Sequence, residues 1–170
     1  MEQDLTFLDP QGHRVAAVLA TPDHGTERVA VLCHGFLSGK RSTTNKTLTR
    51  LLNTQGIATF AFDFLGQGAS DGPFEALTTT TAAAQAIAAL DLVRQKGYRQ
   101  LGLMGSSFGG LVAILTAAQR QDLACLALKC PVVDFAEELR LTLGDKEMAA
   151  WKTTDTIPNI MGGTDRKSVV

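Results

Sequence analysis

The stretch Gly105-Ser106-Ser107-Phe108-Gly109 decides the fold, because it joins an apolar strand-like run at residues 101–104 to an apolar helix-like run at residues 111–118. A serine at the centre of G-x-S-x-G, on a tight turn from strand to helix, is the pattern of a nucleophile elbow. The glycine spacing selects Ser107 over Ser106. The pattern therefore predicts that Ser107 is an enzyme nucleophile.

A serine hydroxyl needs help from its surroundings to act as a nucleophile. It must be held exposed, beside a base and beside donors for the oxyanion that develops. The helix that begins near Phe108 directs its first, unpaired amides at the reacting centre. The backbone N–H of Phe108 is therefore a predicted oxyanion donor.

A second donor is expected from His34-Gly35-Phe36, which follows an apolar strand at residues 29–33. In open α/β folds ligands bind at the carboxyl ends of the strands, where such loops meet. Gly35 lets the backbone bend, so the N–H of Phe36 can face the site. The Phe36 side chain is expected to wall an apolar acyl or aromatic pocket.

The rest of the chain alternates strands with helices. This order predicts an α/β fold with a mostly parallel sheet covered on both faces. A turn-rich Asp9-Pro10-Gln11-Gly12 joins the first two strands into an antiparallel edge hairpin. The expected strands cover residues 5–8, 15–20, 29–33, 57–62, 101–104 and 123–130, and the expected helices residues 43–55, 81–95 and 111–118.

Composition limits the class of partner. The 170 residues are 45% hydrophobic and 19% charged, with a formal net charge of −1, so no overall field favours nucleic acid or an anionic membrane. We expect a small, roughly neutral molecule as the partner. The N-terminus does not resemble a signal peptide and no apolar run is long enough to span a membrane, so a cytoplasmic location is the default.

The cysteines give no sign of a special site. Cys33, Cys125 and Cys130 show no C-x-x-C spacing, so neither a disulfide framework nor a zinc site is indicated. All three lie in or beside apolar runs, which favours plain buried thiols. We expect neither a metal nor a cofactor.

Three motifs at three strand ends together resemble the α/β-hydrolase superfamily, within its esterase and lipase branch. They are His34-Gly35-Phe36, the loop from Asp63 to Gly72 with its glycines, and the elbow around Ser107. The resemblance covers residues 5–133. It implies the strand order 1-2-4-3-5-6-7-8 and hydrolysis through an acyl-enzyme. In it, Asp63 is expected to bind backbone amides of its loop.

A closer resemblance is to bacterial cinnamoyl- or feruloyl-esterase-like hydrolases and relatives of the serine aminopeptidase type. It rests on Phe62-Asp63-Phe64, Pro131-Val132-Val133-Asp134-Phe135, Trp151-Lys152 and Ile157-Pro158-Asn159. It implies a core at residues 1–133 and the start of a lid at residues 134–164, with no convincing strand there. The expected substrate is a carboxylic ester of a small apolar or aromatic acid. An amide or peptide, and a non-catalytic ligand-binding module, are the alternatives.

The chain departs from that family in its histidines. In the family the triad runs Ser, then Asp or Glu, then His, but His13, His24 and His34 all precede Ser107. The triad acid and histidine are absent from the chain, because residues 158–161 make a poor strand to lead into Asp165 as the acid. The chain as written is therefore expected to be nearly inactive and, with strands seven and eight missing, to expose strand six as an aggregation-prone edge.

The tail at residues 165–170 has its own explanation. Its sequence, Asp165-Arg166-Lys167-Ser168-Val169-Val170, matches the translation of a common sequencing adapter. We therefore expect these residues to be non-native and the natural protein to continue past Thr164.

Overall fold

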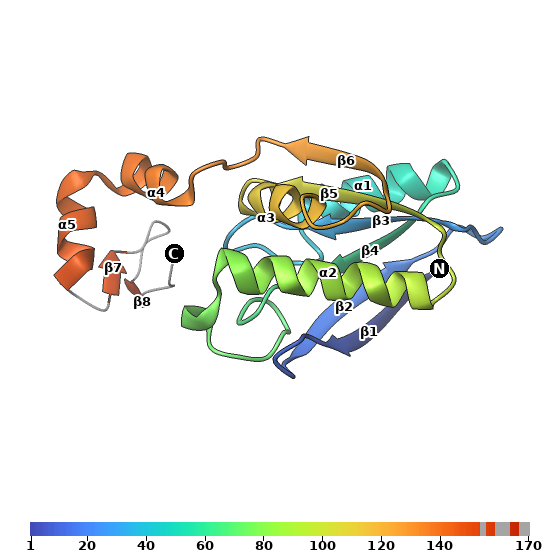
Figure 1. Cartoon of the computed structure of the whole chain (residues 1–170), viewed down its shortest axis with the longest axis horizontal. Helices are drawn as coiled ribbons and strands as arrows, with labels where there is room; N and C mark the ends of the chain where they lie inside the picture. The colour runs from blue at the N-terminus through green and yellow to red at the C-terminus, as the bar shows by residue number, and fades with distance from the viewer. Residues whose placement is uncertain (154–155, 159–163, 167–170) are drawn as a thin grey trace.

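Six strands form one sheet in the order β1-β2-β4-β3-β5-β6 (Figure 1). The computed structural model describes the backbone of residues 1–153, 156–158 and 164–166, and side chains up to residue 149. The order is the one expected for the first six strands of the α/β-hydrolase fold, so the fold class is confirmed. The strands are β1 (Glu2–Leu8), β2 (Arg14–Ala20), β3 (Arg28–Cys33), β4 (Ala58–Phe62), β5 (Gln100–Ser106) and β6 (Leu123–Lys129).

The middle of the sheet is parallel and buried. β3 pairs in parallel with β4 and with β5, so that Val31 lies between Phe60 and Leu103. These strands are short apolar runs, as expected for strands covered on both faces. β1 and β2 form the expected antiparallel hairpin, and β2 pairs antiparallel with β4.

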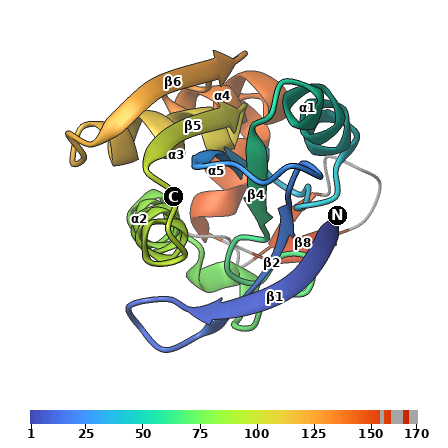
Figure 2. The same ribbon diagram turned by 90° about the vertical axis from the view of Figure 1, so that its right-hand side faces the viewer.

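Helices cover both faces of the sheet. α1 (Thr43–Thr54) lies on one face, and α2 (Thr79–Gln95) and α3 (Phe108–Ala117) lie on the other (Figure 2). α2 begins two residues earlier than the predicted start at residue 81, because Thr78 and Thr81 form a reciprocal capping box. Its alanines at positions 82, 83, 86 and 89 are buried, which lets the helix approach the sheet closely.

β6 is the exposed edge of the sheet. Only β5 pairs with it among the strands that the structure describes, and Leu126 and Leu128 are each 41% exposed. This confirms the predicted apolar edge. It also shows that the prediction of three buried cysteines is wrong, because Cys125 and Cys130 are exposed and only Cys33 is buried.

The segment after β6 forms α4 (Phe135–Leu143), α5 (Asp145–Thr153) and two short strands. The strands, β7 (Thr156–Pro158) and β8 (Thr164–Arg166), pair antiparallel with each other in a separate sheet. The expectation of no strand before residue 164 is therefore wrong at β7. β7 joins β8 and leaves the six-stranded sheet unextended.

Some predictions fall on parts that the structure describes incompletely. Side chains of Trp151 and Asp165 lie outside the described ones, as does residue 159 of the Ile157-Pro158-Asn159 motif. The non-native character of residues 165–170 and the domain boundaries at 133 and 164 stay predictions. In the described part of the chain, no helix has the length and apolar character needed to cross a bilayer.

Candidate active site

Ser107 occupies a strained turn between β5 and α3. Its φ of 54° is uncommon for a residue with a side chain, and such strain persists only where the surroundings hold it. The Ser107 N–H donates to the Lys129 carbonyl at 3.0 Å, and the Ser107 carbonyl accepts from the N–H groups of Gly110 at 2.8 Å and Val132 at 3.1 Å. With a longer bond of 3.4 Å from the Leu111 N–H to the same carbonyl, four hydrogen bonds thus fix the serine backbone, as an elbow requires.

Glycines bring α3 against the end of β3. A Cβ on Gly109 would lie 2.3 Å from the Cys33 carbonyl oxygen, and one on Gly105 would lie 2.0 Å from the Gly109 carbonyl oxygen. No larger residue fits at either position. The close approach also places Gly35 beside the serine, because a Cβ there would lie 3.4 Å from the Ser107 Cβ.

The two predicted oxyanion donors are brought to the same sheet edge. Phe36 and Phe108 lie after β3 and β5, which are neighbours, and their rings are 5.9 Å apart. Within the described residues neither backbone N–H has an acceptor, so both are available to a ligand. The Phe108 amide is also at the N-terminus of α3, where the helix dipole favours negative charge. The oxyanion role of both amides stays a prediction.

His34 cannot act as the base in this arrangement. Its Nδ1 donates to the Gly35 carbonyl at 2.7 Å, and its Nε2 accepts the Phe64 N–H at 3.2 Å. His34 is therefore a neutral imidazole with its proton on Nδ1, and the lone pair of Nε2 is occupied by the hydrogen bond from Phe64. Burial lowers the pKa of His34 from its usual value, which favours the same neutral form. His34 therefore shapes the loop, as expected.

The other two histidines lie elsewhere. The His13 Nδ1 is 3.2 Å from Asp9 Oδ2 in the turn between β1 and β2. His24 precedes β3 and so lies at the amino edge of the parallel strands, opposite the Ser107 edge. No histidine lines the cleft beside Ser107 in the described part of the chain.

That cleft has a volume of about 500 Å³. One side is Ser107, and the other is formed by the segment after β6 and by α4. Both apolar and acidic side chains face it. The lining residues are Ser107, Cys130, Pro131, Val132, Val133, Asp134, Glu137, Glu138 and Leu141.

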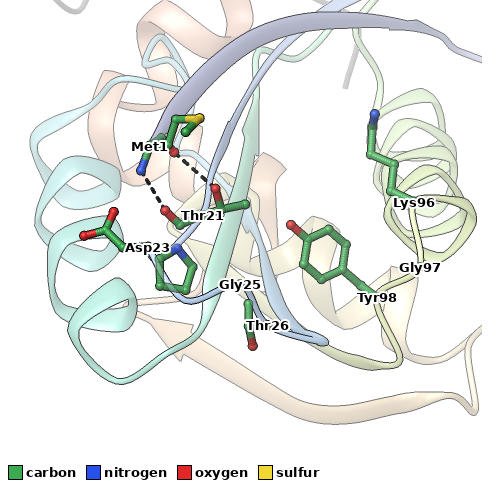
Figure 3. Close-up of a pocket in the computed structure, with 9 residues that line it drawn as sticks. Met1, Thr21, Asp23, Gly25, Thr26, Lys96, Gly97 and Tyr98 are labelled. Carbon is green, nitrogen blue, oxygen red and sulfur yellow. Dashed lines mark hydrogen bonds between the residues drawn. The ribbon is translucent and has the colours of Figure 1, made fainter.

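A second pocket, of about 410 Å³, lies at the opposite edge of the sheet. Figure 3 shows Thr21, Lys96 and Tyr98 around it. The N-terminal ammonium donates to the Thr21 carbonyl there at 2.7 Å. Because Tyr98 precedes β5 and Ser107 follows it, this pocket is separate from the candidate active site.

Aromatic rings pack around Phe36. Its ring centroid is 5.5 Å from that of Phe74, 5.9 Å from that of Phe108 and 5.1 Å from that of Phe135. Phe36 was predicted to wall the pocket, but none of these four rings is among the residues that line the Ser107 cleft, and the packing of Phe74 and Phe135 on Phe36 was not predicted. Their signal was present, since Phe74 ends the loop after β4 and Phe135 lies in the motif after β6.

Asp63 binds the loops around it, as predicted. Its Oδ1 accepts the Lys40 N–H at 2.6 Å and its Oδ2 accepts the Ala69 N–H at 2.9 Å. The Lys40 ammonium lies 2.5 Å from Oδ2, a contact that the sequence analysis missed. Among the described residues, no group of three histidine, cysteine, aspartate or glutamate side chains is arranged to hold a metal ion.

Comparison with known proteins identifies the family of the chain. The family model described as serine aminopeptidase, S33, matches residues 25–169. An uncharacterised 31.7 kDa protein of Escherichia coli, from the traX-finO intergenic region, is 27% identical over 153 residues, which are 88% of this chain and 49% of that protein. The chain thus spans about half the length of the curated relatives it matches.

Solved structures show the same fold. Est1E of Butyrivibrio proteoclasticus, with ferulic acid bound, superposes with a TM-score of 0.80 at 26% identity, over 95% of this chain and 67% of that one. An esterase of Pyrococcus furiosus gives a TM-score of 0.72 at 18% identity, over 91% of this chain and 56% of that one. Together with the match over residues 25–169, the Ser107 elbow and the strand order, these findings show that the chain belongs to the serine aminopeptidase S33 family of α/β-hydrolases.

Proposed function

We propose that the whole protein is a serine hydrolase that cleaves carboxylic esters of small apolar or aromatic acids through an acyl-enzyme. One observation carries the proposal. Ser107 stands on a strained turn at the carboxyl edge of the sheet, and the N–H groups of Phe36 and Phe108, which have no acceptor among the described residues, belong to loops at the same edge. Exposed hydroxyl and preorganised donors are the parts that acyl transfer requires.

The proposed reaction has two halves. The Ser107 Oγ attacks the ester carbonyl carbon while a base takes its proton, and the carbonyl electron pair moves onto the oxygen held by the two amides. Collapse of this intermediate breaks the bond to the alcohol, which leaves with the proton. Water then attacks the acyl-serine by the same route in reverse. The base and its orienting acid would come from family positions beyond those that match this chain.

Two observations support an apolar or aromatic acyl group. The Ser107 cleft is lined by the apolar side chains of Pro131, Val132, Val133 and Leu141, which favour an apolar group. Est1E, with ferulic acid bound, is a relative at 26% identity. A small ester as partner and a cytoplasmic location remain part of this proposal.

An amide or peptide substrate is the second candidate. Glu137 and Glu138 line the Ser107 cleft, and carboxylates there suit a substrate that carries an ammonium group. The family's description as serine aminopeptidase points the same way. The third candidate is a ligand-binding module without catalysis, since no histidine lines the Ser107 cleft among the described residues.

Genomic DNA around codon 164 and enzyme assays of the encoded protein separate these candidates. If the reading frame continues, the whole protein should hydrolyse p-nitrophenyl butyrate and benzoate esters faster than aminoacyl p-nitroanilides. Ser107→Ala should abolish this turnover, and Ser106→Ala, the matched control, should retain most of it. A preference for the anilides would support the peptidase, and a whole protein without Ser107-dependent turnover would support the binding module.

A further inference from the structure

The loop that carries Phe36 is tied at both ends to the same short segment after β4. At its start, the Phe64 N–H donates to His34 Nε2 at 3.2 Å. At its end, the Asp63 carboxylate accepts the Lys40 N–H at 2.6 Å and faces the Lys40 ammonium at 2.5 Å. Residues 63 and 64 therefore hold residues 34 and 40, and the Phe36 amide lies between these two attachments.

The attachment at Lys40 is largely shielded from water. The Asp63 side chain is 2% exposed and the Lys40 side chain 13% exposed. Charge-assisted hydrogen bonds in such surroundings are shorter and stronger than those between neutral groups. A Cβ on Gly68 would lie 2.3 Å from the Asp63 carboxyl, so the carboxylate has little room to move.

The loop between the two attachments has little support of its own. Within residues 35–39 one backbone–backbone hydrogen bond is described, from the Ser38 N–H to the Gly35 carbonyl at 3.2 Å. Leu37 has a φ of 54°, which is unfavourable for a residue with a side chain. The conformation of this stretch therefore depends on how its ends are held and on the packing of the Phe36 ring against Phe74, Phe108 and Phe135.

We infer that His34, Lys40 and Asp63 are positioning residues that fix the direction of the Phe36 N–H in the oxyanion site. This inference rests on the proposed function. The three residues, called the loop clamp below, act through the backbone and do not touch the substrate. The Phe108 amide does not depend on them, because the first turn of α3 and the bonds of Ser107 hold it.

NMR of the ¹⁵N-labelled 170-residue chain tests the loop clamp, with sodium benzoate as the probe. Lys40→Met removes the ammonium and keeps the backbone bond to Asp63, so it perturbs folding less than Asp63→Asn. Arg41→Met is the matched control, since Arg41 is the next cation but pairs with Glu2 and Asp4 on β1. Lys40→Arg tests rescue by a charge-conserving change.

In the wild-type chain we expect benzoate to shift the amide signals of Phe36 and Phe108. In Lys40→Met the Phe36 response should be lost while the Phe108 response stays, and the ¹H–¹⁵N heteronuclear NOE of residues 35–39 should fall in the free protein. Lys40→Arg should restore both readouts. Arg41→Met should match wild type.

Two outcomes are distinguished by this design. If Lys40→Met leaves the heteronuclear NOE of residues 35–39 and the Phe36 signal unchanged, or if Arg41→Met alters them equally, the loop clamp is overturned. If benzoate shifts neither amide in the wild-type chain, the proposed oxyanion role fails, while the NOE of the free protein still decides whether the clamp orders the loop. Asp63→Asn, where it folds, should repeat the Lys40→Met result.

Discussion

The two sides of Ser107 are built differently. On the β3 and β4 side, the Phe36 loop is held by His34, Asp63 and Lys40 and packed by aromatic rings. On the β6 side, the strand has one neighbour, Leu126 and Leu128 are 41% exposed, and Val133 is 79% exposed. Ser107 contacts both sides. Its backbone is hydrogen-bonded to Lys129 and Val132 on the β6 side, and the helix that it begins, α3, packs closely against the end of β3 on the other side.

The difference follows from the number of strand neighbours. A strand inside the sheet has two, so loops at its carboxyl end meet loops from both and can form networks such as the contact between Asp63 and Lys40. An edge strand offers one neighbour and a row of unpaired backbone groups. The Phe36 amide, a proposed oxyanion donor, thus lies on the well-supported side.

The largest expected effect concerns turnover. Without a histidine after Ser107, the 170-residue chain should hydrolyse p-nitrophenyl butyrate no faster than its Ser107→Ala variant. Loss of the histidine from an intact triad costs on the order of 10⁶ in turnover. Initial rates of the two proteins check this. Turnover that depends on Ser107 would mean that a residue of this chain already serves as the base.

The substitution Gly109→Ala tests how closely α3 packs against the end of β3. Its Cβ would lie 2.3 Å from the Cys33 carbonyl oxygen, so α3 and β3 must separate, and we expect a loss of about 3 kcal/mol or more in the free energy of unfolding. Gly12→Ala is the control. Its added Cβ would have no atom within 4 Å, so the only cost is the unfavourable backbone φ of 87°. Urea denaturation that gave equal losses for both would show that the approach of α3 is not tight.

The substitution Phe135→Ala tests whether α4, which follows β6, is anchored to the aromatic rings on the β3 and β4 side. Phe135 is 9% exposed and packs its ring against Phe36 and Phe108, so the change should cost about 3 kcal/mol. Val133→Ala, two residues earlier and 79% exposed, should change the free energy of unfolding by less than about 0.5 kcal/mol. Similar values for both variants would mean that α4 is not anchored to the aromatic cluster.

Lowering the pH should reduce the free energy of unfolding, because His34 on the β3 and β4 side becomes protonated. Burial lowers its pKa below the usual 6.5, so the native state binds a proton less readily than the unfolded chain. The stabilising contribution of neutral His34 is therefore complete above pH 6.5 and is lost as the pH falls through the lowered pKa, with a slope of up to about 1.4 kcal/mol per pH unit.

His34→Gln keeps an acceptor for the Phe64 N–H and does not titrate. The difference in the free energy of unfolding between wild type and this variant, measured from pH 7.5 to 5, should therefore shrink as the pH falls. If this difference in the free energy of unfolding stays constant with pH, His34 does not contribute to the loss of stability in acid.

The smallest change in stability is expected at the β6 edge. Leu126→Lys places a charge on an exposed strand, so the free energy of unfolding should change by about 0.5 kcal/mol or less. Aggregation, followed by light scattering, should nevertheless fall clearly, because charges on edge strands oppose pairing between molecules. Leu51→Lys on α1, where Leu51 is 48% exposed, is the control and should leave aggregation unchanged.

Much of the fold was predictable because its signals are local. Continuous apolar runs mark β3, β4 and β5, and glycines on either side of Ser107 mark the elbow. Burial was less predictable. Cys125 and Cys130 lie in or beside an apolar run like Cys33, yet they are exposed, because burial depends on what packs over a segment and not on the apolar run itself.

The contacts around the site were predictable only in part. Asp63 was expected to bind backbone amides, but its ion pair with Lys40 joins residues that are 23 positions apart. Phe74 and Phe135 meet Phe36 for the same reason, since loops after β4 and β6 return to one sheet edge. No local pattern specifies which side chains from separate loops will touch.

By itself, the sequence determined that this chain has a strand-turn-helix elbow with Ser107 at its apex, and that no histidine follows it. Both depend on the order of residues along the chain. Only the tertiary structure decided that, among the described residues, the Phe36 and Phe108 amides have no acceptor, that His34 Nε2 accepts the Phe64 N–H, and that β6 pairs with β5 alone. These features arise from the pairing order of the strands, which brings distant loops together and leaves one strand without a second neighbour.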